Sequence, residues 1–145
     1  MTEHKNLKII AFAGLPGSRI DAIMRRLAER GIPRVSRHDI VSQIRHLADA
    51  GQHRIITDEL DSLDLYKTMK HEFPGELVVV GIVTNRNLRH NRIIHQDKAI
   101  EDDWDHDQTD IATVIGMADI FLTDNGNEDA LLQKIAALLT GLKFN

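Results

Sequence analysis

A glycine-rich turn near the amino terminus has residue types and spacing that suit phosphate binding. The stretch AFAGLPGSRID, residues 11–21, contributes Gly14, Pro16, Gly17 and Ser18 after a short apolar run. Such a turn offers backbone N–H groups and the start of a helix to phosphate oxygens. The complete motif reads G-x-x-x-x-G-K-[ST], in which the lysine neutralises phosphate charge and the hydroxyl holds magnesium. The first half of this motif is present.

The second half of the motif is replaced. Arg19, Ile20 and Asp21 stand where the second glycine, the lysine and the hydroxyl belong. A carboxylate in the first turn of a helix is favoured by the helix dipole by about 0.3–1 kcal/mol, so we expect Asp21 to occupy or repel the position that a phosphate needs. Arg19 could pair with Asp21 or lie in solvent; alternatively, it could reach a phosphate in place of the lysine.

Other charged residues have two interpretations each. Asp58 ends the apolar run of IITDEL, where it could orient magnesium or an attacking hydroxyl, or be an ordinary surface acid. The segment 86–96 is basic, and its Arg89 and Arg92 could grip a triphosphate or form a solvated face paired with acids. Residues 102–110 place five carboxylates around His106. We expect a solvated helix start there rather than a metal site.

These groups need a scaffold, and hydrophobic periodicity predicts one of alternating strands and helices. Strands are expected at residues 8–13, 33–36, 53–60, 76–84 and 119–123. Helices are expected at 18–30, 39–50, 62–73, 86–96, a segment ending near 117, and 127–141. The alternation indicates an α/β fold in which helices flank a five-stranded parallel sheet in three layers.

Composition limits the partners. The 145 residues fit one domain, residues 1–145, and carry a net charge of −4 with no cysteine. A nucleic-acid partner is not expected, because the basic residues form no large patch and aromatic residues make up 4%. No apolar run suits a membrane span and the amino terminus lacks a signal-peptide core. We therefore expect a cytoplasmic protein.

Several stretches, taken in chain order, resemble the P-loop nucleoside-monophosphate kinases. They are AGLPGS, the DELDS strand end at 58–62, the arginine segment TNRNLRHNRII and the terminal ADIFLTDNGN. The resemblance is closest to the adenylate-kinase-related, dephospho-coenzyme-A-kinase-like branch, and it covers nearly the whole chain. It implies a P-loop kinase-like fold, with ATP and magnesium as cofactors. By the same resemblance, Asp58 would be the catalytic acid, Arg89 and Arg92 would bind phosphate, and residues 97–110 would be a lid remnant.

The departures from this family concern chemistry. Glu59 and Asp61 replace a glycine and an arginine of the family's DG-x-R-S strand end, and Gln96 and Lys98 stand where lid arginines are expected. Only one expected helix lies between the second and third strands, so the segment that holds the acceptor nucleotide is missing. Phosphoryl transfer depends on charge neutralisation and alignment. We therefore expect no kinase turnover.

Three functional hypotheses follow. The first is a degenerate kinase homologue, a pseudoenzyme, that binds a nucleotide weakly or has a regulatory role through a protein partner. The second is an active small nucleotide or dephospho-coenzyme-A kinase that uses ATP, magnesium and Arg19 in place of the loop lysine. The third is a self-associating module, a homodimer that covers a face left bare by the missing segment.

Overall fold

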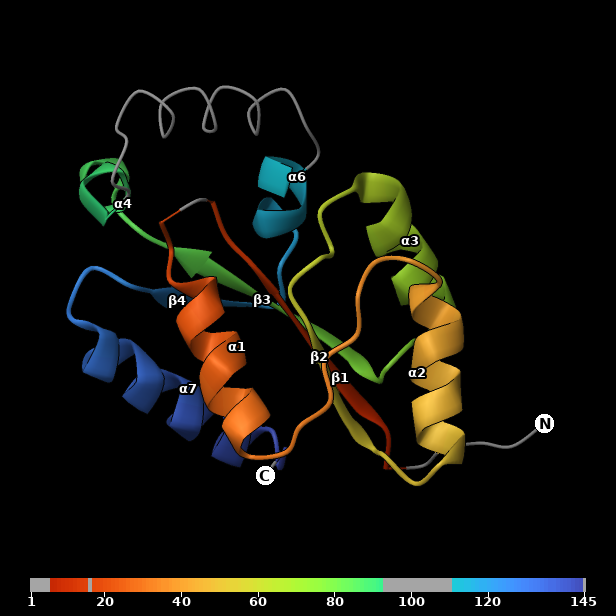
Figure 1. Cartoon of the computed structure of the whole chain (residues 1–145). Coiled ribbons are helices and arrows are strands. Elements are labelled where there is room, and N and C mark those ends of the chain that lie inside the picture. Colours follow the sequence, from red (N-terminus) through yellow and green to blue (C-terminus); the bar gives the residue numbers. More distant parts are fainter. Residues whose placement is uncertain (1–5, 16, 93–110, 145) are drawn as a thin grey trace.

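The computed structural model describes residues 6–15, 17–92 and 111–144, without the side chains of residues 90–92. Its centre is a parallel sheet of four strands in the order β2-β1-β3-β4 (Figure 1). The strands are β1 (Lys8–Ala13), β2 (Arg54–Thr57), β3 (Leu77–Val83) and β4 (Ile120–Thr123). Because β1 pairs with both β2 and β3, it is a central strand. The turn that follows β1 therefore lies at the middle of the sheet's carboxyl edge.

Helices cover both faces of this sheet. Helices α1 and α7 lie on one face, and α2, α3 and α6 lie on the other (Figure 1). Their bounds are α1 (Ile20–Glu29), α2 (Ile40–Asp49), α3 (Leu63–Glu72), α4 (Arg86–Arg92), α6 (Ile111–Gly116) and α7 (Glu128–Gly141). The three-layer α/β arrangement is the expected one. Among the described residues, no helix is both long and apolar enough to cross a membrane.

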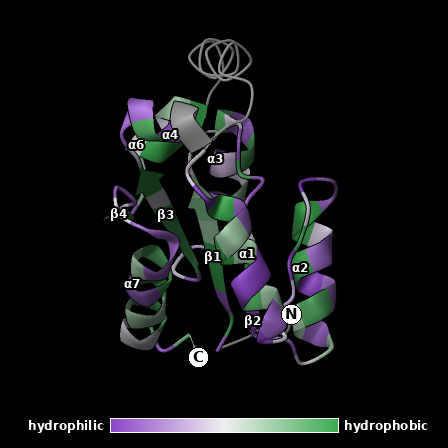
Figure 2. Ribbon diagram, turned by 60° about the vertical axis from the view of Figure 1, so that its left-hand side comes forward, coloured by the Kyte–Doolittle hydropathy of each residue, from purple (hydrophilic) through white to green (hydrophobic). Residues whose placement is uncertain are grey.

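The two faces of β1 build two separate cores. Ile9 and Ala11 point to the α2 and α3 side, whereas Ile10 and Phe12 point to the α1 and α7 side. A strand buried on both faces needs a continuous apolar sequence rather than an alternating one, as KIIAFA provides. Figure 2 shows hydrophobic central strands between helices that carry hydrophilic surfaces. The sheet is therefore a rigid support for the turns at its ends.

The expected strand at 33–36 is wrong, so the sheet has four strands and not five. Residue Arg34 forms only an isolated parallel bridge to Ile56, closed by Val35 N–H to Ile56 O and Ile56 N–H to Pro33 O. Pro33 has no N–H to donate. The backbone N–H and carbonyl of Ser36 bond the Gln43 side chain instead. The backbone groups that would extend a ladder are therefore absent or used by α2.

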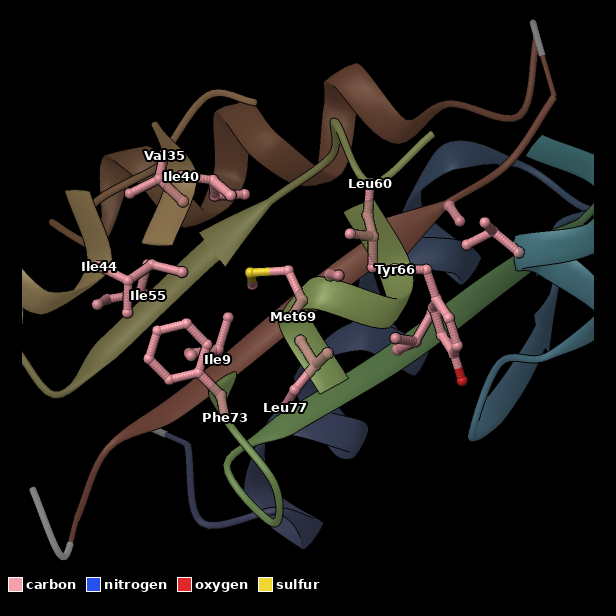
Figure 3. Packing of buried hydrophobic residues seen from close by; sticks show 14 of the residues in the cluster. Ile9, Val35, Ile40, Ile44, Ile55, Leu60, Tyr66, Met69, Phe73 and Leu77 are labelled. Carbon is pink, nitrogen blue, oxygen red and sulfur yellow. The ribbon is translucent and has the colours of Figure 1, made fainter. Parts of the chain in front are cut away.

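The core on the α3 side gives a test of the packing. Met69 is fully buried and packs among Ile55, Phe73 and Leu77 (Figure 3). We predict that Met69→Ala lowers the free energy of unfolding by about 2–5 kcal/mol, because it removes buried contacts and leaves a cavity. Urea unfolding measures this. Exposed Lys67 lies on the same helix, and Lys67→Ala should change the free energy by less than about 0.5 kcal/mol; equal losses in both variants would contradict the packing.

Candidate functional site

The glycine-rich turn connects the carboxyl end of β1 to the start of α1. Ser18 is buried, and its N–H donates to the Leu15 carbonyl at 3.1 Å. Gly17 has φ +87°, which glycine adopts freely. Arg19, at the place of the motif's second glycine, has φ 60° and ψ 27°. A left-handed backbone costs an L-residue roughly 1–2 kcal/mol; the turn thus keeps a glycine-like conformation without the glycine. Pro16 lies outside the described residues.

The side chain at the lysine position packs back onto the turn. A Cβ placed on Gly14 would lie 3.1 Å from Ile20 Cδ1 and would clash with the Ser18 hydroxyl. Ile20 also packs against the core between α1 and α7. An apolar side chain therefore lies beside the first motif glycine, and it offers no charge to an anion.

Helix α4 approaches the turn from the other side. A Cβ placed on Gly17 would lie 2.6 Å from the Arg89 carbonyl oxygen and 2.9 Å from its Cα. Arg89 is only 4% exposed. Arg89 thus lies against the turn through its backbone, and the phosphate-binding role of its side chain stays a prediction. The side chain of Arg92 and residues 97–110, the expected lid remnant, lie outside the described part of the chain.

Arg19 reaches across to the turn between β4 and α7. Its Nη1 donates to Asp124 Oδ1 at 3.3 Å and to the Gly126 carbonyl at 3.1 Å. The Asp124 side chain is fully buried, and that of Arg19 is 25% exposed. The expected pairing of Arg19 with Asp21 is therefore wrong. Parallel strands end at a common edge, so the turn after β4 lies close enough for the long arginine side chain.

Asp21 lies in the first turn of α1, as expected. It is exposed, and within the described residues its carboxylate has no hydrogen bond or ion pair. The carboxylate adds negative charge at the helix start through space. It does not cap the backbone N–H groups of the turn.

Asp58 follows β2 at the same edge of the sheet. Thr57 pairs with Ala11, which places Asp58 beside the last residues of β1. Its Oδ1 accepts a hydrogen bond from Arg34 Nε at 2.9 Å and lies 2.7 Å from Nη2 of the same guanidinium in an ion pair. A second pair, Arg37 to Asp61, lies alongside at 3.0 Å. Asp58, the carboxylate expected to orient magnesium or an attacking hydroxyl, is paired with an arginine. Its catalytic role stays a prediction.

Sequence reasoning missed the function of the turn TDNGN. Besides Asp124, its Asn125 Oδ1 accepts from the Asn85 N–H at 2.8 Å, just before α4. Its Asn127 caps α7 by accepting from Ala130 N–H at 2.8 Å. This turn therefore connects the glycine-rich turn, the start of α4 and the start of α7. The sequence signal for this role was an Asp directly after an expected parallel strand, where strand ends come together.

Metal-binding side chains do not gather in the described part of the chain: no group of three or more His, Asp or Glu residues lies there in an arrangement that could hold an ion. The acidic stretch around His106 lies outside it. At the described residues, the arrangement is one of arginine–carboxylate pairs rather than of converging carboxylates.

The fold, a parallel sheet flanked by helices, is similar to that of solved kinases. The chain is similar to the crystal structure of shikimate kinase from Bacteroides thetaiotaomicron, with a TM-score of 0.60 and 11% identity, over 94% of this chain and 98% of that one. It is also similar to a gluconokinase from Sinorhizobium meliloti, with a TM-score of 0.58 and 12% identity, over 94% and 96%. At these identities the likeness concerns the fold alone.

In sequence, the chain is similar to a UPF0200 protein of Thermococcus onnurineus. The two are 25% identical over 90% of this chain and 96% of the relative. The match runs over 177 positions, more than the 145 residues present here, so the relative has residues where this chain has none. No protein-family model matches the chain.

The unusual backbone of Arg19 can be separated from its ion pair. We predict that Arg19→Gly is more stable than Arg19→Ala by about 1 kcal/mol, since both lose the bond to Asp124 but only glycine accepts φ 60° without cost. Urea unfolding compares the two. Arg25 is exposed in the interior of α1, and there the order should reverse, with Gly less stable than Ala by about 1 kcal/mol. The same order at both positions would contradict the assigned backbone.

Proposed function

We propose that this P-loop kinase-fold protein has no phosphotransferase activity and acts by binding, as a regulatory or interaction protein with at most weak affinity for nucleotides. The observation that carries the proposal is the use of Arg19. This residue is the sole cation between Gly14 and Asp21, and its guanidinium holds Asp124 and the Gly126 carbonyl. A bound triphosphate would have to compete with a buried carboxylate for it.

ATP with magnesium does not fit the residues of the turn. Ile20 provides no charge for the phosphates, and Asp21 offers a carboxylate where a hydroxyl would hold magnesium. The Arg89 backbone lies against Gly17, where a loop that cradles phosphates needs open space. Phosphoryl transfer relies on neutralising charge at the transferred group, and this turn has little left to do so. We therefore derive no catalytic step.

The family branch belongs to the same proposal. The order of motifs supports descent from nucleoside-monophosphate or dephospho-coenzyme-A kinases. One helix, α2, lies between the bridge at Arg34 and β2, and the similar Thermococcus protein is longer in places. Both facts support loss of the acceptor-binding segment. The competing hypothesis, an active kinase using Arg19, requires this guanidinium to leave Asp124.

Nucleotide binding provides the decisive test. We predict that ATP with magnesium leaves the melting temperature of the natural chain unchanged, because a ligand raises it only by binding the folded state. The triple variant Arg19→Gly, Ile20→Lys, Asp21→Ser should gain an ATP-dependent rise. The same variant with serine and glycine but with Ile20 retained is the matched control, and it should gain much less.

Turnover would contradict the proposal. A coupled assay with nucleoside monophosphates or dephospho-coenzyme A should show no activity in the natural chain. Activity that depends on Asp58, or an ATP-induced stabilisation that Arg19→Ala abolishes, would instead establish the active kinase with arginine in place of lysine.

The interaction role is supported by an apolar patch at the β3–β4 edge. Its residues are Phe121, which is 52% exposed, and Val83, which is 43% exposed. Gly81 pairs with Phe121 and Val83 with Thr123, so Val83 and Phe121 share one face of the sheet. Exposed apolar side chains that gather in this way are typical of contact surfaces. We propose a second copy of the chain as the occupant, because β4 is an edge strand and a two-fold dimer would cover the patch on both copies.

Light scattering at two concentrations tests this association. We predict a mass that rises from one chain toward two with concentration, and that Phe121→Glu holds at one chain because it places a charge in the patch. Lys67→Glu, on the exposed side of α3, should associate like the natural chain. A single-chain mass at both concentrations would exclude the dimer.

A further inference from the structure

A cavity lies at the amino-terminal edge of the sheet, opposite the glycine-rich turn. It is formed by the loops that follow α1 and α2, with Leu139 of α7 as part of its wall, and its volume is about 330 Å³. Arg30, His53 and Arg54 contribute its cationic and imidazole groups, and Ile32 and Pro33 its apolar side. The volume falls at the lower end of the range of small-molecule sites, about 300–1,000 Å³.

The charge of this cavity is one-sided. Its lining contains two arginines and no Asp or Glu. Neither Arg30 nor Arg54 forms an ion pair within the described residues. Four other arginines pair with carboxylates: Arg19 with Asp124, Arg34 with Asp58, Arg37 with Asp61 and Arg45 with Glu72. Two guanidinium groups that form no ion pair among the described residues therefore line one cavity, and this charge suits an anion.

The two loops are fixed before any ligand binds. Each helix ends in a left-handed glycine, Gly31 with φ +78° and Gly51 with φ +93°. The next residue in each case bonds back five positions, Ile32 N–H to Leu27 O at 3.2 Å and Gln52 N–H to Leu47 O at 2.9 Å. This pattern is a Schellman cap, which closes a helix in one defined geometry. The cavity is therefore formed by the fold itself.

Arg54 is oriented toward the carboxyl-terminal segment. Its Nη1 donates to the Phe144 carbonyl at 3.2 Å, and this is its one side-chain bond within the described residues. No other N–H group of its planar fork has a partner in the part of the chain that the structure describes. A guanidinium fork matches the spacing of two phosphate oxygens, and two forks can share one dianion.

We propose that this cavity binds a small phosphorylated metabolite, with the phosphomonoester held by Arg30 and Arg54 and the organic part against Ile32, Pro33 and Leu139. A doubly charged tetrahedral group uses both arginines, whereas a single carboxylate satisfies one. The site uses no residue of the glycine-rich turn. It would thus give a protein without phosphotransferase activity a ligand-sensing function at the far edge of its sheet.

Inorganic phosphate is the probe for the test. Calorimetric titration at pH 7.5 and constant ionic strength, with sodium chloride as the balancing salt, should show saturable binding to the full chain. Backbone amide resonances of Gly31, Gly51 and Gln52 should shift with the same midpoint. Succinate, a dicarboxylate of equal charge, should bind at least about ten-fold more weakly, because it lacks the tetrahedral arrangement of oxygens.

Substitutions then locate the site. Arg30→Gln and Arg54→Gln should each weaken phosphate binding about ten-fold or more, as expected for loss of a charge-assisted hydrogen bond. Both residues are exposed, so the variants should keep the natural unfolding midpoint. Arg25→Gln, on the same helix as the residues before Arg30 but outside the cavity, is the matched control and should change binding less than about two-fold.

Three results of the titrations would overturn the proposal, and one result of the amide measurements would do so as well. They are phosphate affinity that Arg25→Gln lowers as much as Arg30→Gln does, equal affinity for succinate, and no saturable binding. Amide shifts confined to Gly14, Gly17 and Ser18 would also overturn it, and would at the same time count against the proposed loss of phosphate binding at the turn. The two proposals can therefore fail separately.

Discussion

The ion pair between Arg19 and the buried Asp124 is the constraint on which the carboxyl edge of this sheet depends. It joins residues 105 positions apart in the chain and sets the direction of the single cation in the glycine-rich turn. Redirecting that cation to a ligand would remove a charged donor from a buried carboxylate, which costs about 1–3 kcal/mol or more. A phosphate would have to supply that free energy before gaining any affinity, and Ile20 and Asp21 contribute no cation of their own. The fold keeps the shape of a phosphate-binding turn while its charge serves the packing of the last strand.

The same ion pair accounts for a residue in an unfavourable conformation. A non-glycine residue with φ 60° persists only where its surroundings hold it. For Arg19, the bond to Asp124, the second bond to the Gly126 carbonyl and the start of α1 together do so. Asn125, one residue beyond Asp124, bonds the backbone just before α4. The turn after β4 thus fixes both the glycine-rich turn and the helix that packs on Gly17. A substitution at Asp124 should therefore affect two other segments, the glycine-rich turn and α4, through short, direct contacts.

The fold could be predicted from the sequence further than the site could. Continuous apolar runs such as KIIAFA and LVVVGIV, bounded by glycine or proline, identify buried parallel strands directly. The stretch PRVS was wrongly predicted as a strand because its composition suits one. Pro33 lacks an N–H donor, which the sequence shows. The bond between the Gln43 side chain and the Ser36 backbone is visible only in the structure. The partner of Arg19 was also out of reach. Sequence proximity favoured Asp21, two positions away, but the guanidinium reaches the carboxylate that follows β4, two strands away from β1. Spacing rules predict contacts within one helix or one strand. They do not predict which side chains meet where the ends of four strands come together.

The distribution of charge distinguishes the two edges of the sheet. At the carboxyl edge, Arg19, Arg34 and Arg37 each have a carboxylate partner. At the amino edge, Arg30 and Arg54 line a cavity without an acid. The chain has 22 acidic residues against 18 lysines and arginines, so a shortage of carboxylates does not explain the difference. The arginines of the carboxyl edge are thus engaged by carboxylates, whereas those of the amino edge face a cavity. The glycine-rich turn and the basic cavity at the far end of the sheet are therefore physically separate features, and each can be altered without the other.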